Sequence, residues 1–289
     1  MQIGKKDFTP AGMIKKNGND LPLLSIVTVV YNGQEFLEET ILSIANQTYQ
    51  GIEYIIIDGG SSDGTVDIIK KYEHVIDSWV SESDEGIYDA MNKGAKIANG
   101  SYISFLNASD TYLEDTAQKI ADLIVKQECD YYCGPAIIQN QINNDSFISY
   151  PLVNFQYHKG AIMGMPAPHL SVFMKTEFFH DLHGYDLSFA LSSDFDLLLR
   201  MTAHTNNVYY LQEPIGVFRL GGVSGSYRTL IDNFYVFKKH HVPLWTRIAH
   251  TAFYAIRLFL QNNLPSRVVD SSRLKLSNVK NHKKEKIKS

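Results

Sequence analysis

Oxygen-bearing side chains crowd the segment ISFLNASDTY, where Asn107, Ser109 and Asp110 follow a short run of apolar and small residues. A run of this kind is typical of a buried strand. Carboxylate and amide oxygens at the end of a strand can coordinate a hard divalent cation. Asn, Ser and Asp are also ordinary turn residues. On these residues alone, the segment is compatible with a metal site or with a plain turn.

Further apolar runs precede this segment, and amphipathic stretches separate them. The runs are too short for typical helices, whereas the stretches between them carry apolar residues at helical spacing. Strands are expected at 23–30, 52–58, 78–82 and 101–106, and helices at 34–47, 63–72 and 87–100. This alternation predicts right-handed βαβ units, and hence an α/β fold with a mostly parallel sheet and helices on both faces.

Polar residues follow each predicted strand, at the carboxyl edge where open parallel sheets bind ligands. They are Tyr31 and Asn32, then Asp58, then Asp84, and finally Asn107 and Asp110. Neither the glycine fingerprint of dinucleotide-binding folds nor a P-loop follows the first strand. A diphosphate at this edge would need another counter-charge, and a divalent cation held by carboxylate oxygens could supply it.

The pattern changes after about residue 128. Two strands are expected at 130–140 and 145–153, joined by a turn, and an extended stretch at 207–220 precedes the glycine-rich loop 221–226. A helix is expected at 192–203, with Ser192 or Ser193 as its N-cap and acidic residues in its first turn. This part completes one α/β domain with a helical C-terminus.

Several of these segments, in the same order, resemble glycosyltransferase family 2, and more narrowly its bacterial polysaccharide and surface-glycan branch. The resemblance spans about residues 23–226 and rests on 25–65, 81–110, 169–175, 184–186, 192–200 and 216–225. It implies a GT-A fold with a Rossmann-like sheet. It also implies a nucleotide-diphosphate sugar donor, with a UDP-sugar favoured, Mg²⁺ or Mn²⁺ as cofactor, a glycan or lipid-linked acceptor, and inversion at the anomeric carbon.

The resemblance also assigns roles to individual residues. Asp194 matches the catalytic base, with a first-turn acid serving the helix dipole as the alternative, and Asp196 is expected to be supporting or structural. Asp110 is the expected metal ligand. Asp58 could instead cap a turn, Asp84 could be a surface acid, and Lys93 a solvated lysine. The full set expected to bind the nucleotide-sugar is Thr28, Val30, Tyr31, Asn32, Asp58, Asp84, Asn92, Lys93 and Asn107.

A last group is expected near the acceptor or in a mobile lid, namely His169, Arg219, Gly221, Gly222 and Ser224. His169 could equally be a core histidine, and the glycines a simple turn. Two positions depart from the family pattern: Ser109 stands where a carboxylate is common, and Leu170 replaces a glutamine. Affinity for metal without nucleotide should therefore be low. The departures also motivate an alternative function, a non-catalytic nucleotide-sugar-binding subunit of a glycan-synthesis complex.

The net charge and the cysteine content limit the classes of function that this protein could have. The net charge of −4 gives no reason to expect nucleic-acid binding, and the two cysteines suggest reduced thiols in a cytoplasmic protein. No secretory signal or membrane-spanning run is expected. The aromatic segment 244–260 and the basic tail after it could touch an anionic membrane from the cytoplasmic side. Alternatively, they could form a packed helix and a solvated tail. The expected divisions are a lead-in at 1–22, the transferase domain at 23–226, a helical extension at 227–263 and a disordered basic tail at 264–289.

Overall fold

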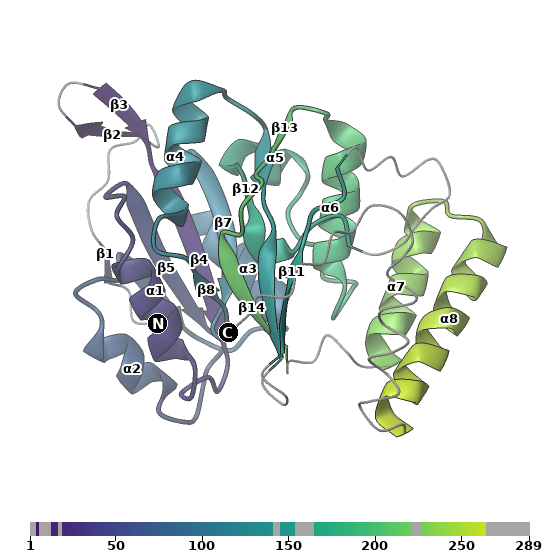
Figure 1. Cartoon of the computed structure of the whole chain (residues 1–289). Coiled ribbons are helices and arrows are strands. Elements are labelled where there is room, and N and C mark those ends of the chain that lie inside the picture. The colour runs from purple at the N-terminus through teal and green to yellow at the C-terminus, as the bar shows by residue number, and fades with distance from the viewer. Residues whose placement is uncertain are drawn as a thin grey trace.

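Four parallel strands form the middle of the main sheet (Figure 1). The computed structural model describes residues 4–5, 13–16, 19–140, 145–153, 165–220 and 227–263. Within it, β4 pairs on one side with β5 and on the other with β7, and β6 continues the sheet beyond β5. The strands are β4 Leu24–Val30, β5 Ile52–Asp58, β6 Ser78–Ser81 and β7 Tyr102–Asn107. All four expected strands are confirmed.

Shorter strands extend the main sheet on both sides. The strand β12 (Val172–Lys175) runs antiparallel between β7 and β9 (Tyr131–Cys133), and β13 (Val208–Tyr210) lies parallel to β9. At the other edge, β1 (Gly4–Lys5) is antiparallel to β6. The central sheet is thus mainly parallel, as predicted.

Helices cover both faces of this sheet because side chains along each buried strand alternate between the faces. On one face, Leu24 and Ile26 pack in a core with α1 Leu37–Ala45, α2 Thr65–Lys71 and α4 Thr116–Lys126. On the other, Val27 and Val29 pack with α3 Ile87–Ile97, α5 Thr176–Asp181 and α6 Ser193–His204.

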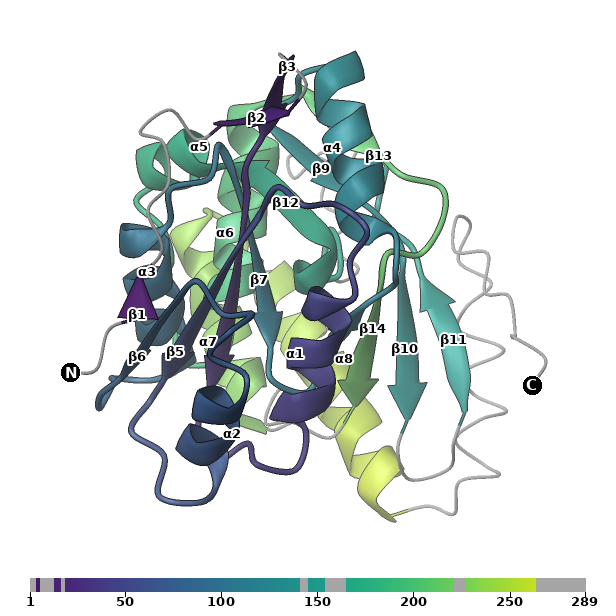
Figure 2. The same ribbon diagram turned by 90° about the vertical axis from the view of Figure 1, so that its left-hand side faces the viewer.

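A second sheet, which we did not predict, has the order β11-β10-β14-β8 (Figure 2). It contains β8 Thr111–Tyr112, β10 Ala136–Asn140, β11 Ser146–Ser149 and β14 Gly216–Leu220. The prediction of one strand over 130–140 was therefore wrong. The chain leaves the main sheet after β9 at Gly134 and Pro135, and proline has no N–H to continue a ladder. A hairpin of β2 (Met13–Lys16) and β3 (Asn19–Pro22) precedes β4.

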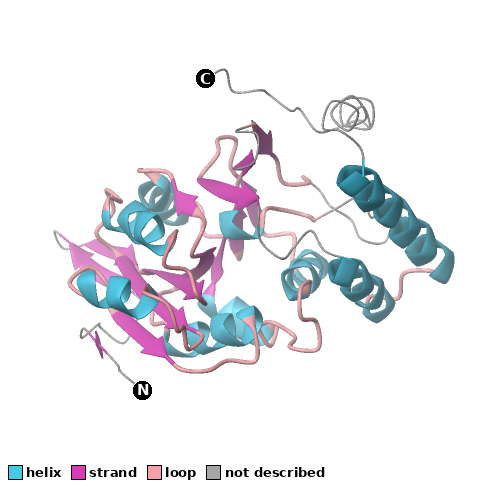
Figure 3. Ribbon diagram, turned by 90° about the horizontal axis from the view of Figure 1, so that it is seen from below, coloured by secondary structure: helices cyan, strands magenta, loops and turns pink. Residues whose placement is uncertain are grey.

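Two helices, α7 (Tyr227–Lys239) and α8 (Leu244–Asn263), lie to one side of the sheets (Figure 3). Val236 and Phe237 of α7 pack against Phe195 and Leu199 of α6 in a small core of their own. In the part of the chain that the structure describes, no helix has the length and hydropathy needed to cross a bilayer.

Candidate active site

The carboxyl ends of the parallel strands lie level with one another. In the register of the main sheet, Val30 pairs with Asp58, and Asp58 pairs with Ser81 of β6. On the other side of β4, Val29 pairs with Asn107, the last residue of β7. The polar segments that follow these strands therefore start from one edge of the sheet, which is the ligand-binding edge of open α/β folds.

The loops that follow β4 and β5 bind each other through their own polar groups. The Asn32 N–H donates to Ser61 Oγ at 2.7 Å, and Asn32 Oδ1 accepts the Ser62 N–H at 2.9 Å. Asp58 is fully buried, and its carboxylate accepts hydrogen bonds from Ser61 and from the Ser81 hydroxyl. Asn32 and Asp58 thus hold the loops at this edge together. Their contacts with a nucleotide stay a prediction.

Asp84 reaches the same edge from the loop between β6 and α3. A Cβ atom on Gly59 would lie only 2.4 Å from Asp84 Oδ2, so the absence of a side chain at Gly59 leaves room for this carboxylate. Asp84 is half-buried, and its Oδ1 accepts the Gly86 N–H at 2.9 Å. The Tyr31 side chain is 66% exposed beside β4. Among the predicted nucleotide contacts, Tyr31 and Asn32 are exposed and Asp84 is partly open to solvent.

Strand alternation places two of the predicted donor contacts in the core instead. Thr28 is fully buried, and the Tyr54 hydroxyl donates to its Oγ1 at 3.2 Å. Val30 is buried in the core beneath α1. At these two positions only the backbone remains for a ligand, and their contacts with a donor stay a prediction.

The two residues of α3 that are expected to bind the donor, Asn92 and Lys93, have partners within the protein, and their contacts with a donor stay a prediction. Asn92 donates to the Tyr185 carbonyl at 2.9 Å and accepts the Tyr185 N–H at 3.0 Å, so both ends of its amide hold the segment before α6. Lys93 pairs with Glu82 and Asp89, each at 3.2 Å. These opposite charges come from its own helix and the preceding loop, and they raise the pKa of Lys93 although its partial burial lowers it.

The turn after β7 contains two buried side-chain oxygens that have no hydrogen-bond partner among the described residues. The Asp110 N–H donates to the Asn107 carbonyl at 2.9 Å, which closes the turn. Asn107 Oδ1 and Asp110 Oδ2 are both buried, and neither has a hydrogen-bond partner among the residues that the structure describes. Burial raises the pKa of Asp110 to about 7, although the Arg219 N–H donates to its Oδ1 at 3.1 Å. Leaving such oxygens unsatisfied is costly, so this turn is suited to a ligand.

The chemistry of these two oxygens suits a divalent cation. Both are hard ligands of the kind that Mg²⁺ and Mn²⁺ accept. The described residues contain no group of three or more His, Cys, Asp or Glu side chains that could hold a metal. The turn could therefore hold a cation only in part, with the donor's phosphates and water completing the shell.

His169 and Arg219 join this turn from distant parts of the chain. His169 lies in a short 3₁₀ helix, His169–Ser171, just before β12, and its Nε2 is 3.4 Å from Asn107 Nδ2. Burial lowers the pKa of His169, and the charge of Asp194 opposes this. The side chain of Arg219 pairs with Glu39 of α1. The antiparallel pairing of β14 with β8 accounts for the position of Arg219 beside Asp110.

Asp194 lies half-buried in the first turn of α6, and a tyrosine that the sequence did not point to holds it. The Tyr88 hydroxyl of α3 donates to Asp194 Oδ1 at 2.8 Å, and the Phe195 N–H donates to the same oxygen at 2.8 Å. Among the described residues, no donor reaches Oδ2. Burial, followed by the charge of Asp194, raises the pKa of Tyr88 far above its usual value, so the phenol keeps its proton. The carboxylate is thus oriented through one oxygen, and the other remains for a ligand.

Asp196, two residues further along α6, is directed away from Asp194 and into a cluster of basic side chains. Its fully buried carboxylate contacts Arg200 Nε at 2.8 Å, Lys239 Nζ at 3.0 Å and His240 Nε2 at 2.8 Å. Burial alone would raise the pKa of Asp196, but these partners outweigh it and lower it. Lys239 is the last residue of α7, and His240 follows it directly. Their contacts with Asp196 therefore join α7 to α6, the helix that carries Asp194.

The predicted N-cap position of α6 is confirmed, but the expected capping hydrogen bond is not formed. Ser192 is the N-cap residue, yet its side chain makes no capping hydrogen bond. The hydroxyls of Ser192 and Ser193 are buried without partners among the described residues. The lid residues Gly221, Gly222 and Ser224, and the tail 264–289, lie outside the described residues.

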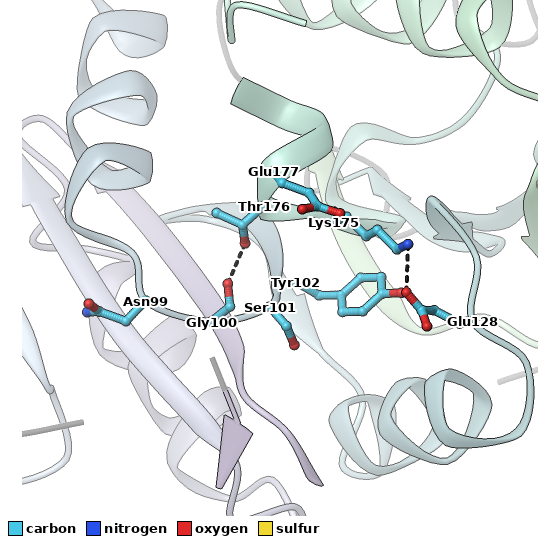
Figure 4. Close-up of a pocket in the computed structure, with 8 residues that line it drawn as sticks. All are labelled: Asn99, Gly100, Ser101, Tyr102, Glu128, Lys175, Thr176 and Glu177. Carbon is cyan, nitrogen blue, oxygen red and sulfur yellow. Dashed lines mark hydrogen bonds and ion pairs between the residues drawn. The ribbon is translucent and has the colours of Figure 1, made fainter. Parts of the chain in front are cut away.

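A pocket of about 330 Å³ lies at the opposite end of β7 from Asn107 (Figure 4). Tyr102 at the start of β7 lines it, together with Lys175 and Glu128, which form an ion pair at 2.7 Å. Glu128 neutralises the charge of Lys175. The pocket lies at the start of β7, whereas Asn107 lies at its end, so the pocket is separate from the candidate site.

Comparison with known proteins gives the site a context. The family model described as Glycosyl transferase family 2 matches residues 25–178, which is more than half of the chain. A Bacillus subtilis protein named as a teichuronic acid biosynthesis glycosyltransferase is 32% identical over 135 residues, which cover 45% of this chain and 54% of that protein.

Two solved structures share the fold. A mannosyltransferase from Pyrobaculum calidifontis, in complex with GDP-Man and Mn²⁺, matches with a TM-score of 0.59 at 14% identity over 95% of this chain and 84% of that chain. TarS from S. aureus, in complex with UDP-GlcNAc, matches with a TM-score of 0.55 at 14% identity over 82% and 72%.

Proposed function

The chain belongs to glycosyltransferase family 2, and we propose that it transfers a sugar, with inversion, from a nucleotide-diphosphate donor to a hydroxyl of a glycan or lipid-linked acceptor. We place this reaction in bacterial cell-surface polysaccharide synthesis, and the Bacillus subtilis relative supports that setting. A UDP-sugar is our favoured donor, although the two solved structures contain one UDP-sugar and one GDP-sugar. The sugar is of the hexosyl or N-acetylhexosaminyl type.

The observation that carries this proposal is the way Asp194 is held. A general base must present a free carboxylate oxygen to the proton that it removes. Tyr88 and the Phe195 N–H both bind Oδ1, which leaves Oδ2 available. Burial lowers the pKa of His169 and the charge of Asp194 opposes this, and His169 Nε2 lies 3.4 Å from Asn107 Nδ2, on the side chain that carries one of the partnerless oxygens. The base and the expected phosphate-binding turn therefore belong to one site.

In the proposed reaction, Asp194 Oδ2 takes the proton of the acceptor hydroxyl while the acceptor oxygen bonds to the anomeric carbon. The bond from that carbon to the diphosphate oxygen breaks at the same time, and the nucleoside diphosphate leaves. A single displacement of this kind inverts the anomeric configuration. Tyr88 keeps the carboxylate oriented throughout, because its own pKa is too high for it to lose its proton.

Asn107 and Asp110 would hold the cation that this family is expected to use. When bound, Mg²⁺ or Mn²⁺ would neutralise charge on the leaving diphosphate. Because Ser109 adds no carboxylate to the turn, the protein ligands number fewer than a cation needs. We therefore expect metal and nucleotide to bind together.

Replacing Tyr88 with phenylalanine is expected to lower kcat by roughly tenfold to a hundredfold, since a hydrogen bond to a charged group contributes about 1.5–3 kcal/mol. The donor KM should change little, because Tyr88 touches the base and not the nucleotide. Steady-state kinetics would measure both constants. The matched control is Tyr102→Phe, which removes another buried hydroxyl, one that donates to the Cys129 carbonyl at 2.7 Å. Equal loss of kcat in both variants would contradict a positioning role for Tyr88.

Replacing Asp110 with asparagine is expected to abolish the part of nucleotide binding that depends on metal. In the natural protein, UDP with Mn²⁺ at about 100 times its Kd should stabilise the fold by about 2.7 kcal/mol, and UDP alone by much less. Thermal-shift measurements with and without a chelator would show the difference. Asp122→Asn, at an exposed position of α4, is the control. Undiminished stabilisation of Asp110→Asn by UDP and Mn²⁺ would remove Asp110 from the cation site.

The experiment that tests the function as a whole is a screen of UDP-, GDP- and dTDP-sugars for thermal stabilisation and for turnover, with and without Mn²⁺. We expect one donor class to stabilise the protein in the presence of metal and to be consumed. Stabilisation without turnover on any acceptor pool would instead favour a non-catalytic nucleotide-sugar-binding subunit.

A further inference from the structure

The long helix α8 turns its most apolar row towards solvent. Trp245, Ile248, Ala252 and Ile256 follow one another at spacings of three and four residues, so they share one face of the helix. All four are exposed, Trp245 by 79% and Ile256 by 60%. We call this row the outer face of α8. In Figure 1, α8 lies at the outer side of the molecule, with α7 between it and the sheets.

Polar side chains occupy the opposite side of the same helix. Arg247, His250 and Thr251 are partly buried, and Arg247 Nε, His250 Nδ1 and Thr251 Oγ1 have no hydrogen-bond partner among the described residues. The His250 ring packs edge-on against Phe237 of α7, with 4.7 Å between the ring centroids. Burial lowers the pKa of His250 to about 4. A surface helix in water normally has the reverse polarity. The orientation of α8 therefore indicates an apolar medium on its outer face.

The charges around α8 indicate which apolar medium this is. The helix contains arginines but no Asp or Glu. Residues 264–289, which follow it directly, contain eight Lys and Arg residues against Asp270 and Glu285. An apolar face joined to a strongly basic segment matches a bilayer that carries anionic headgroups. A second copy of the chain would instead bring two basic segments together, which like charges oppose.

We propose that α8 lies flat on an anionic lipid bilayer, with its outer face in the boundary between headgroups and acyl chains. A helix of this length extends about 30 Å along the surface. The basic residues after Asn263 contribute electrostatic attraction to the same leaflet. Binding of this kind requires neither a sugar donor nor an acceptor, so it stands or falls separately from the transferase activity.

The consequence for the candidate site follows from the cluster around Asp196. Lys239 and His240 at the end of α7 bind Asp196 of α6, and α8 begins only a few residues later. Asp194 lies on the same first turn of α6. A bilayer that holds α8 therefore also fixes the distance and orientation of the catalytic helix relative to the lipid surface.

The test is co-sedimentation of the full chain with vesicles of phosphatidylcholine alone or with phosphatidylglycerol added. We expect several-fold more protein on the anionic vesicles, and less of it at high salt. Tryptophan emission should shift to the blue on binding. This change reports Trp245, because only 3% of the surface of Trp79, the other tryptophan, is exposed.

Ile256→Glu should weaken vesicle binding by at least about tenfold, because burying the Ile256 side chain in the bilayer would contribute about 1.5–3 kcal/mol. Its matched control is Val125→Glu, at an exposed aliphatic position of α4, which should bind as the natural protein does. Circular dichroism would show that both variants fold. Equal binding by the two variants, or no binding to anionic vesicles, would overturn the proposal. A dimer that Ile256→Glu dissociates, without vesicle binding, would assign the outer face to a second copy.

Discussion

Asp194→Asn should lower kcat for sugar transfer by about 10²- to 10⁴-fold, the usual contribution of a general base. Asparagine keeps an oxygen that can accept the hydrogen bonds from Tyr88 and the Phe195 N–H, but it cannot take the acceptor's proton. The thermal stability and the donor Kd should therefore stay close to those of the natural protein. Initial rates at saturating donor, together with calorimetric binding of UDP, would separate chemistry from binding.

The control for Asp194→Asn is Asp181→Asn, which removes an exposed carboxylate at the end of α5. This variant should transfer sugar at the natural rate. If Asp194→Asn also kept its full rate, another group would have to serve as the base, and the proposed mechanism would be wrong.

Asp196→Ala should have the largest effect on stability, lowering the free energy of unfolding by about 3–5 kcal/mol. The reason is that Arg200, Lys239 and His240 would lose the one buried carboxylate that they share. The attachment of α7 to α6 would weaken at the same time. Urea unfolding followed by circular dichroism would measure the change, with Asp122→Ala on the exposed side of α4 as the control. A loss as small as that of the control would mean that the cluster does not hold the helices together.

The same cluster predicts a dependence on pH. Because the pKa of Asp196 is lowered in the folded protein, its contribution to stability is complete above the pKa of an unfolded aspartate, which is about 3.9. The contribution is lost as the pH falls further, through the lower folded-state pKa. The difference in stability between the natural protein and Asp196→Ala should therefore shrink below about pH 4. A constant difference down to pH 2 would contradict the lowered pKa.

Much of the fold could be predicted because its strands and helices carry local signals. The buried runs that became β4, β5 and β7 are rich in branched and aromatic residues, and the stretches between them have helical spacing. The shared edge followed from the parallel arrangement, in which the neighbouring residues Val29 and Val30 of β4 pair with Asn107 and Asp58 on the two sides. The second sheet could not be predicted, because the separation of β9 from β10 depends on long-range pairing of β10 with β14.

The site was harder to predict because its side chains bind partners that are far away in the sequence. Tyr88 has the spacing of a core residue in α3, and only the fold brings its hydroxyl to Asp194, 106 residues away in the sequence. A tyrosine in a helix that follows a polar strand end was the one available signal. The hydrogen bonds between Asn92 and Tyr185 could not be predicted for the same reason, since Tyr185 lies in another segment. The burial of Thr28 follows from the position of β4 in the middle of the sheet, where every residue of the strand is buried.

Time-resolved proton NMR of donor turnover tests the central claim most directly, because it reports both transfer and stereochemistry. The signal to follow is the anomeric proton of the first product, whether a glycosylated acceptor or, without acceptor, the free sugar before it mutarotates. A single displacement assisted by Asp194 predicts consumption of one donor class in the presence of Mn²⁺ and a product of the opposite anomeric configuration. A product that retains the donor's configuration, or no turnover of any donor class, would contradict it.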